Sequence, residues 1–295
     1  MAWFKRISLF LVVNILVMVT ISFVLNAFGV RPYLDAQGID YQSLMIFCLA
    51  WGMGGAFISL GLSRIMAKMM MRVKVINPST ATGPQKEIVD MVHRFAKTAG
   101  ITTMPEVGIY DSPEINAFAT GPTKNRSLVA VSSGLLNRMD RDQVEGVIAH
   151  EMAHISNGDM VTMTLVQGII NAFVMFLARV IAFAIAQNAK EESRPMIRFG
   201  VTIVLEIALS VLGAIVVSYF SRHREFRADA GGARFAGREK MISALKGLQG
   251  TLGRIDNDQP AMATLKISGK PGGLMALLST HPPLEERIRR LERGI

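Results

Sequence analysis

The sequence predicts a mostly α-helical membrane protein, with four transmembrane helices and one α+β domain that contains a small sheet. Three observations support this fold class. Half of the 295 residues are hydrophobic, the mean hydropathy is positive at +0.34, and the apolar residues gather in four long runs. A run of roughly 20 apolar residues can cross a ~30 Å hydrocarbon core as a helix.

The four apolar runs cover residues 7–28, 43–62, 160–186 and 196–220. Each one reaches the length of a membrane-spanning helix. The first run is too long for a cleavable signal peptide, and no small-x-small site with a polar exit follows it. We therefore expect the first run to remain in the protein as an anchor.

Basic residues beside these runs predict the orientation of the chain. Lys5 and Arg6 precede the first run, and Arg64, Lys68 and Arg72 follow the second run with no acid among them. The positive-inside rule places such residues on the cytoplasmic side. The third and fourth runs then form a hairpin that leaves the cytoplasm and returns to it.

Two charges lie deep inside the predicted hairpin. Arg179 and Glu206 stand at similar distances before and after Glu192, near which the turn is expected. An ion pair between them would lower the cost of placing each charge in the membrane. The alternative is that Arg179 extends alone toward the membrane surface.

The composition argues against several other classes of protein. The net charge of +9 fits cytoplasmic loops beside anionic lipid as well as a nucleic-acid surface. Aromatic residues make up only 7% of the chain and do not alternate with basic ones, so we expect no nucleic-acid partner. Cys48 is the single cysteine, which excludes an intrachain disulfide and a cysteine-based zinc site. The oligomeric state is left open.

Two segments outside the apolar runs, 75–159 and 221–295, are expected to form the α+β domain. Helical spacing of apolar residues predicts a helix that ends near Gly100. The stretches PEVGIYD and SLVAVSS are typical of short strands, with INAFAT between them. Asp140 and Gln143 fit a capping box at the start of a helix that runs to His154. The stretch 250–273 is loop-like.

This last helix carries the motif HEMAH, with His150, Glu151 and His154. Residues four apart lie on the same face of a helix, so both imidazoles can reach one metal ion. Glu151 points about 100° away from His150 and can approach a bound water without being a ligand. This arrangement is typical of a zinc site with a general base. The motif is short, and two ordinary histidines on an amphipathic helix are the alternative.

A catalytic zinc site needs a third protein ligand and an open position for water. The best segment for it is SRHREFRADAGGARFAG, after the fourth run. Glu225 and Asp229 lie one turn apart, whereas His223 lies nearly opposite Glu225, so His223 and Glu225 do not easily reach one ion. Spacing alone leaves two interpretations open. Either Glu225 binds the metal and Asp229 accepts a hydrogen bond from a ligand histidine, or the two acids pair with neighbouring arginines, namely Arg222, Arg224 and Arg227.

The number of predicted spans is consistent with a shared site. His154 and Glu225 are 71 residues apart, with two apolar runs between them. Two crossings return the chain to the side from which it started. Both segments are therefore expected on the cytoplasmic face.

The motifs AHEMAHISNGDM, SRHREFRADAGGA and STHPPLEERIRRLE, in this order behind two N-terminal spans, resemble the HtpX family. These are heat-shock-associated zinc metalloproteases of the bacterial inner membrane, in the gluzincin group with the CAAX prenyl endopeptidases. The resemblance implies a zincin-like protease domain made of 75–159, with the HExxH helix, and 221–295, with the third ligand. An N-terminal helix pair, 1–74, and a hairpin, 160–220, would hold it on the membrane.

The resemblance also implies the cofactor and its ligands. One Zn²⁺ per chain would be bound by His150, His154 and Glu225, with Glu151 as the catalytic glutamate and Asp229 as a supporting acid. The resemblance, and not the spacing, favours Glu225 over His223. Substrates would be polypeptides, namely misfolded or damaged membrane proteins that are cleaved at the cytoplasmic face of a multi-pass inner-membrane protein during stress.

Three further residues are candidate substrate contacts. In the family, INAFAT resembles an edge-strand region that holds substrate in extended form, which makes Asn116 and Ala119 candidates for β-addition. A plain edge strand and turn is the alternative. His281, in THPP, either helps to hold the oxyanion or order the cleft, or caps the last helix, which starts at two prolines.

Two other functions remain open at this point. The chain could be a membrane scaffold or chaperone with a vestigial site, although the intact HExxH and E-F-x-A-D motifs argue against this. It could also be a transporter that uses Arg179 and Glu206. Four spans beside two sizeable soluble segments make a transporter the weaker interpretation.

Overall fold

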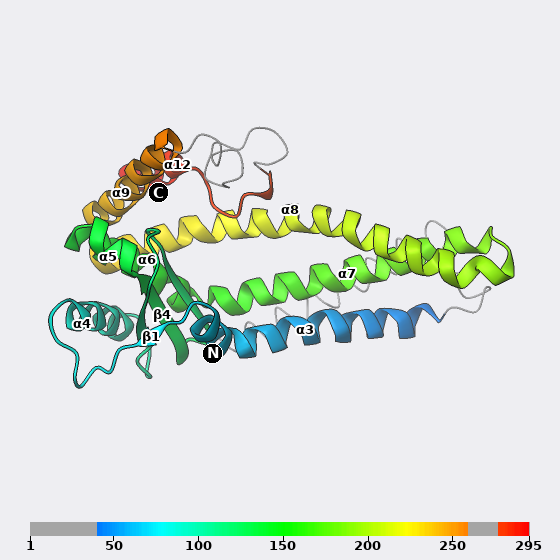
Figure 1. Cartoon of the computed structure of the whole chain (residues 1–295), viewed down its shortest axis with the longest axis horizontal. Helices are drawn as coiled ribbons and strands as arrows, with labels where there is room; N and C mark the ends of the chain where they lie inside the picture. The colour runs from blue at the N-terminus through cyan, green and yellow to red at the C-terminus, as the bar shows by residue number, and fades with distance from the viewer. Residues whose placement is uncertain (1–39, 259–276, 295) are drawn as a thin grey trace. The chain divides into compact units, whose positions relative to one another are not determined.

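A computed structural model of the chain describes residues 40–258 and 277–294. The first predicted span, 7–28, lies outside the described residues, as does most of the stretch 250–273. The start of that stretch is not a loop, because helix α9 (Arg238–Asp258) continues through it. The chain divides into two compact units, and Figure 1 labels helices and strands of both. We name Met1–Ile58 with Thr164–Ala214 the membrane unit, and Ser59–Met163 with Ile215–Ile295 the sheet unit.

Three long apolar helices stand out in the described chain. They are α3 (Tyr41–Met70), α7 (Asp159–Gln187) and α8 (Arg194–Ala236). Each contains a segment long and apolar enough to cross a membrane, with mean hydropathies of 1.8, 2.3 and 2.4. They match the second, third and fourth predicted spans, so the chain is a mostly helical membrane protein. The helix of the fourth span extends beyond the apolar run that ends at Phe220, because α8 continues unbroken to Ala236.

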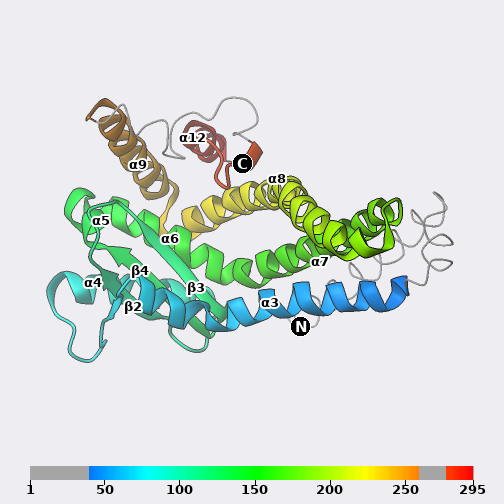
Figure 2. The same cartoon turned by 45° about the vertical axis from the view of Figure 1, so that its right-hand side comes forward.

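In the membrane unit, α7 and the first part of α8 form a helical hairpin (Figure 2). A short 3₁₀ turn, Glu191–Ser193, joins the two helices. The expected ion pair inside the hairpin is confirmed, since Arg179 Nη1 donates to Glu206 Oε1 at 2.7 Å. The same nitrogen also donates to the carbonyl oxygen of Met175 at 3.0 Å. Each charge therefore has a partner in the apolar hairpin, which lowers its cost there.

The sheet unit contains a four-stranded mixed sheet in the order β1-β2-β4-β3. Its strands are β1 (Lys74–Val75), β2 (Glu106–Tyr110), β3 (Ala117–Thr123) and β4 (Arg126–Ser132). β2 and β4 are parallel, whereas β1–β2 and β3–β4 are antiparallel. The two strands expected from the sequence, β2 and β4, are confirmed. The edge strand that the family resemblance implied is present as β3, and β1 is an addition. β4 is central and apolar along most of its length, because both of its faces are covered.

Two helices build the core of this unit together with the sheet. They are α4 (Gly83–Thr98) and α6 (Arg141–Asn157), and a short helix, α5 (Ser133–Arg138), precedes α6. The common core contains side chains from α4, β4 and α6, among them Val92, Phe95, Val129, Ile148 and Met152. α4 ends at Thr98, and Gly100 follows shortly after it at φ 66°. This agrees with the helix end that the sequence predicted near Gly100.

The ends of α6 are fixed by local chemistry. The predicted capping box is present, because Asp140 Oδ1 accepts from the Gln143 backbone N–H at 2.9 Å and the Gln143 side chain accepts from the Asp140 N–H. At the other end, Gly158 adopts a left-handed conformation at φ 69° and donates to the carbonyls of His154 and Ile155. Glycine adopts this conformation without strain. The helix that carries the HExxH motif therefore has two defined ends.

A buried carboxylate joins α6 to two other helices. Glu145 is 8% exposed and pairs with Arg94 of α4 and with Lys240 of α9, whose Nζ lies 2.8 Å from Glu145 Oε2. α9 in turn packs against the last helix, α12 (Leu284–Arg293). Removing one partner of a buried pair leaves an uncompensated charge, which is costly. This network therefore fixes α6 between α4 and α9.

Two glycines let α8 approach α6 closely. A Cβ at Gly231 would lie 2.7 Å from the Cβ of Ala153, and one at Gly232 would lie 3.2 Å from the backbone nitrogen of His150. A side chain at either position would push the two helices apart. The short distance between α6 and α8 therefore requires glycine at both positions.

We predict that Gly231→Ala lowers the free energy of unfolding by about 1–3 kcal/mol, because the added methyl group overpacks a rigid contact. Thermal unfolding of the full chain in detergent would measure this. Gly61→Ala is the matched control, since Gly61 lies in helix α3 and a Cβ there meets no atom within 4 Å. Alanine at an open helical position should stabilise slightly. Equal unfolding temperatures for the two variants would contradict the close approach.

Candidate metal centre

Three side chains from α6 and α8 meet at one point in the sheet unit. His150, His154 and Glu225 are all buried, and one ligand atom from each lies within 4.8 Å of the others. The two Nε2 atoms are 3.2 Å apart. Each of them lies 3.3 Å from an oxygen of Glu225. Ligands at zinc distances in a tetrahedron lie roughly 3.3–3.4 Å from one another, so this spacing fits a zinc ion.

Each histidine is oriented by a carboxylate on its other ring nitrogen. His150 Nδ1 lies 3.0 Å from Asp229 Oδ1, and His154 Nδ1 lies 2.7 Å from Asp159 Oδ2. A carboxylate accepts a hydrogen bond, so each Nδ1 carries the proton and each Nε2 keeps its lone pair for a metal. The sequence suggested this role for Asp229.

Each orienting carboxylate is held by an arginine in turn. Arg287 of α12 donates Nε and Nη2 to the two oxygens of Asp229 at 2.8 and 2.7 Å. Arg227 of α8 donates Nη2 to Asp159 Oδ1 at 2.9 Å. Bidentate arginine–carboxylate pairs are strong and directional. Two chains of histidine, aspartate and arginine therefore fix the two imidazoles.

The three ligand atoms together are suited to a metal cation. With both Nδ1 atoms protonated, the two Nε2 atoms and the Glu225 carboxylate are three hydrogen-bond acceptors that face one another. Buried acceptors without a donor or a cation between them are unfavourable. A zinc ion satisfies all three at once, which is the fit expected of a resident metal.

The same crowding of acceptors controls the protonation of the site. Burial opposes a charge on both imidazoles, but their hydrogen bonds to carboxylates outweigh it and raise the pKa of His154 to about 9 and that of His150 above its usual range. Burial likewise opposes ionisation of Glu225, yet hydrogen bonds from the histidines hold its pKa well below the usual range. Zinc must displace these protons, so we expect its affinity to fall at low pH.

The structure answers the question that spacing left open at Glu225. Glu225 lies in the cluster, whereas His223 is exposed on α8 and His93 lies on α4 outside the cluster. The competing interpretation, acids paired with nearby arginines, holds only for Arg224, which donates to Glu225 Oε1 at 3.2 Å. Asp229 is paired with Arg287 instead.

Glu151 and His281 lie beside the cluster in different ways. Glu151 is half-buried and makes no hydrogen bond or ion pair with the residues that the structure describes. His281 Nδ1 lies 2.9 Å from Glu225 Oε2. The helix-capping role considered for His281 is wrong, because Pro283 is the N-cap of α12 and no side chain caps that helix. The loop before α12 is held by Arg222, whose Nη1 donates to the carbonyl oxygen of Ser279 at 2.7 Å.

The two substrate candidates of the INAFAT stretch lie at the open edge of the sheet. Ala119 is opposite Val129 in β3, the edge strand. Asn116 precedes β3, and its carbonyl oxygen accepts from the Ser132 backbone N–H at 2.9 Å. Bonded and non-bonded pairs alternate along an antiparallel ladder, so Ala119, three residues on, turns its backbone N–H and C=O toward the open edge.

Sequence reasoning missed Arg287. For Asp159 it left two roles open, since this residue could brace the HExxH helix or simply end it beside Gly158. Arg287 is 6% exposed and Asp159 is fully buried. An arginine in ERIRRLE carries no local sign of burial, because its partner Asp229 is 58 residues away. For Asp159, the position directly after the HExxH helix was the available signal.

A zinc site on an HExxH helix, completed by a glutamate from a later helix in a chain with long apolar helices, defines a membrane zinc metallopeptidase with a zincin-like site. Comparison with known proteins makes this specific. The family described as Peptidase family M48 matches residues 83–295. The chain belongs to this family.

Relatives match over nearly the whole chain. The chain is 54% identical to "Protease HtpX homolog" of Bacillus velezensis, over 98% of this chain and 99% of that protein. It is 49% identical to "Protease HtpX" of Thioalkalivibrio sulfidiphilus, over 98% of each chain. The crystal structure of S. mikatae Ste24p superposes with a TM-score of 0.60 at 17% identity, and covers 96% of this chain and 66% of that one. This last likeness shows a shared fold.

We predict that Glu225→Ala loses stoichiometric zinc and that Asp229→Asn binds zinc about 10- to 100-fold more weakly, since the imidazole of His150 is no longer fixed. Metal analysis of the purified full chain after chelator titration would measure both. His223→Ala is the control, because this histidine is exposed on the same helix. Unchanged zinc in Glu225→Ala, or zinc loss in His223→Ala, would place the third ligand elsewhere.

Proposed function

We propose that the chain is an endopeptidase of the bacterial inner membrane that cleaves misfolded or damaged membrane proteins at the cytoplasmic face, as part of protein quality control under stress. The observation that carries the proposal is a complete set of zinc ligands beside Glu151, whose carboxylate has no hydrogen-bond or ion-pair partner among the residues that the structure describes. Arg64, Lys68 and Arg72 follow the second apolar run (43–62) with no acidic residue between them, which supports the cytoplasmic orientation. The high identity to proteins named HtpX supports the cellular role.

In this mechanism, Glu151 moves the protons. Bound zinc would polarise the scissile carbonyl and lower the pKa of a water toward ~7. Glu151 accepts a proton from the attacking water and later delivers it to the leaving amine. A carboxylate that is not engaged in an ion pair is available for both steps. Asp229 and Arg287 keep His150 in the tautomer that leaves Nε2 free.

His281 is proposed to act at the same edge of the site. It is 62% exposed at its side chain, yet it holds Glu225 Oε2 through Nδ1. An exposed imidazole beside the metal ligands can face a substrate. We assign it to holding the oxyanion that develops on the scissile carbonyl.

The substrate is proposed to bind as an extra strand along β3. The outward N–H and C=O of Ala119 offer a main-chain ladder to an extended peptide. β3 packs beside α6, which carries the HExxH motif. Asn116, whose carbonyl oxygen is already engaged by Ser132, would contribute through its exposed side chain. An edge strand recognises backbone and not sequence, which suits an enzyme for unfolded segments.

We predict that Glu151→Gln lowers kcat by about 100-fold or more while zinc content stays the same, because general acid–base catalysis is lost and the ligands are not. Casein cleavage and metal analysis on the same preparations would measure both. Glu87→Gln is the control, since Glu87 is an exposed acid on α4. Cleavage by Glu151→Gln at the normal rate would exclude the mechanism. A membrane protein with a folded or an unfolded cytoplasmic loop, reconstituted with the enzyme, tests the substrate class.

We predict that Ala119→Pro keeps the fold but lowers kcat/KM for a peptide roughly fivefold, because one main-chain hydrogen bond of about 1 kcal/mol is lost. Proline is tolerated in an edge strand where its missing N–H faces outward. Ala119→Val retains the N–H and is the matched control. Equal kcat/KM for the two variants would argue against β-addition at this residue.

A further inference from the structure

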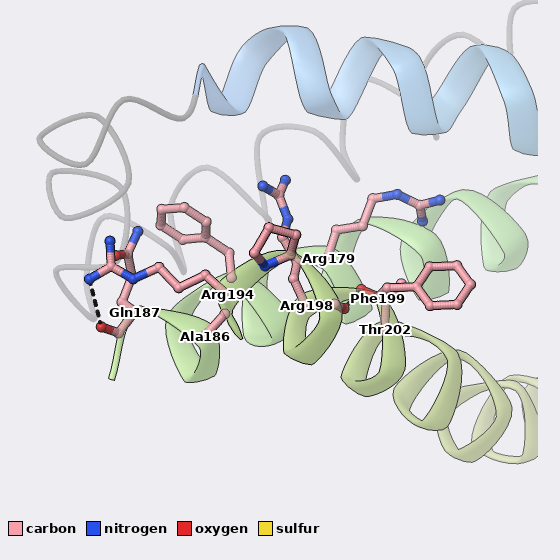
Figure 3. Close-up of a pocket in the computed structure, with 9 residues that line it drawn as sticks. Arg179, Ala186, Gln187, Arg194, Arg198, Phe199 and Thr202 are labelled. Atoms are coloured by element: carbon pink, nitrogen blue, oxygen red, sulfur yellow. Dashed lines mark hydrogen bonds between the residues drawn. The ribbon is translucent and has the colours of Figure 1, made fainter. Parts of the chain in front are cut away.

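The hairpin of α7 and α8 contains a cavity of about 490 Å³ that the peptidase reaction does not use (Figure 3). All the residues that line it belong to the membrane unit, whereas the metal ligands belong to the sheet unit. Its charged lining residues are Arg179, Arg194 and Arg198, with no aspartate or glutamate among them. A concave site lined by positive charges attracts an anion.

The first two arginines are partly engaged. Arg179 is neutralised by Glu206 at 2.7 Å. Arg194 donates Nε to the carbonyl oxygen of Ala189 at 3.1 Å and Nη2 to the carbonyl oxygen of Gln187 at 3.4 Å (Figure 3). Its Nη1 lies 3.8 Å from a carboxylate oxygen of Glu191, which is 90% exposed. An exposed pair at this distance contributes little. The two carbonyl partners are neutral, so the positive charge of Arg194 is largely uncompensated and can attract an anion.

Arg198 is the least engaged of the three. Its guanidinium lies 5.6 Å from the ring centroid of Phe183, and within the part of the chain that the structure describes it has no ion-pair partner. Arg194 and Arg198 are four residues apart on α8, so they lie on the same face of the helix. Guanidinium groups in such a pair are well suited to phosphate oxygens.

The surface beside these arginines is apolar and exposed. Met196 is 74% exposed, and Phe199, which also lines the cavity, is 70% exposed. On a helix that crosses a membrane, exposed apolar side chains face acyl chains. A ligand here therefore meets cations and lipid-facing side chains together. A soluble anion would gain nothing from Met196 and Phe199, whereas a lipid uses both kinds of contact.

We propose that this cavity binds the phosphate headgroup of an anionic phospholipid, with Arg198 and Arg194 as donors and the acyl chains along the exposed face of α8. Such a site would hold the hairpin at a membrane surface that carries this lipid. It lies outside the peptidase site and does not depend on the proposed function.

The test uses the full-length chain in a neutral detergent. Native mass spectrometry would measure binding of phosphatidylglycerol and phosphatidylcholine to wild type, Arg198→Gln, Arg198→Lys and Lys190→Gln. Lys190 is the matched control, because it is an exposed cation of the same hairpin loop and does not line the cavity. Thermal unfolding of each variant shows that it is folded. A further arm adds inorganic phosphate as a competitor.

We expect wild type to prefer phosphatidylglycerol, Arg198→Gln to bind it about tenfold more weakly, as fits the loss of one charged hydrogen bond, and Arg198→Lys to retain part of the affinity. Lys190→Gln should bind as wild type does. Equal binding of the two lipids, or an equal loss in Lys190→Gln, would overturn the proposal. Inorganic phosphate that binds as tightly as the lipid would also overturn it and assign the cavity to a soluble anion.

Discussion

The imidazoles of His150 and His154 must both present Nε2 to the metal position, and the rest of the metal centre depends on the groups that hold Nδ1 of each ring. His150 and His154 each meet an aspartate at Nδ1. A neutral imidazole carries one proton, so a carboxylate at Nδ1 determines that Nε2 is the free donor atom. Without that constraint, two histidines one turn apart would be ordinary buried side chains. The ligand set thus begins with Asp229 and Asp159, which bind no metal themselves.

Fixing these aspartates explains why distant parts of the chain meet at the site. A buried carboxylate needs a partner, and here the partners are Arg287 on the last helix and Arg227 on α8. Arg287 is buried and keeps its charge. Burial opposes that charge, but hydrogen bonds to Asp229 and the neighbouring acids outweigh it and raise the pKa of Arg287. The last helix is therefore part of the metal site, although it contributes no ligand.

Sequence reasoning succeeded where the signal is local. The capping box at Asp140, the strands around INAFAT and the pairing of Arg179 with Glu206 follow from spacing and charge within short segments or one hairpin, and the structure confirms them. Sequence reasoning was less informative where interacting residues are far apart in the chain. Arg287 gave no sign of its link to Asp229, and helical geometry alone did not choose between Glu225 and a paired surface acid. His281 was ambiguous for the same reason, because its partner lies 56 residues away.

The two helices of the site use the same spacing. His150 and His154 are one turn apart on α6, and Glu225 and Asp229 are one turn apart on α8. The two residues of each pair are therefore separated by the same distance along their helix, and the pairs face each other because the helices lie close together. In this arrangement Glu225 reaches both Nε2 atoms, while Asp229 reaches Nδ1 of His150. The absence of side chains at Gly231 and Gly232 makes this approach possible. Because one helix carries both acids, a displacement of α8 by a single methyl group would weaken the third ligand and the tautomer control together.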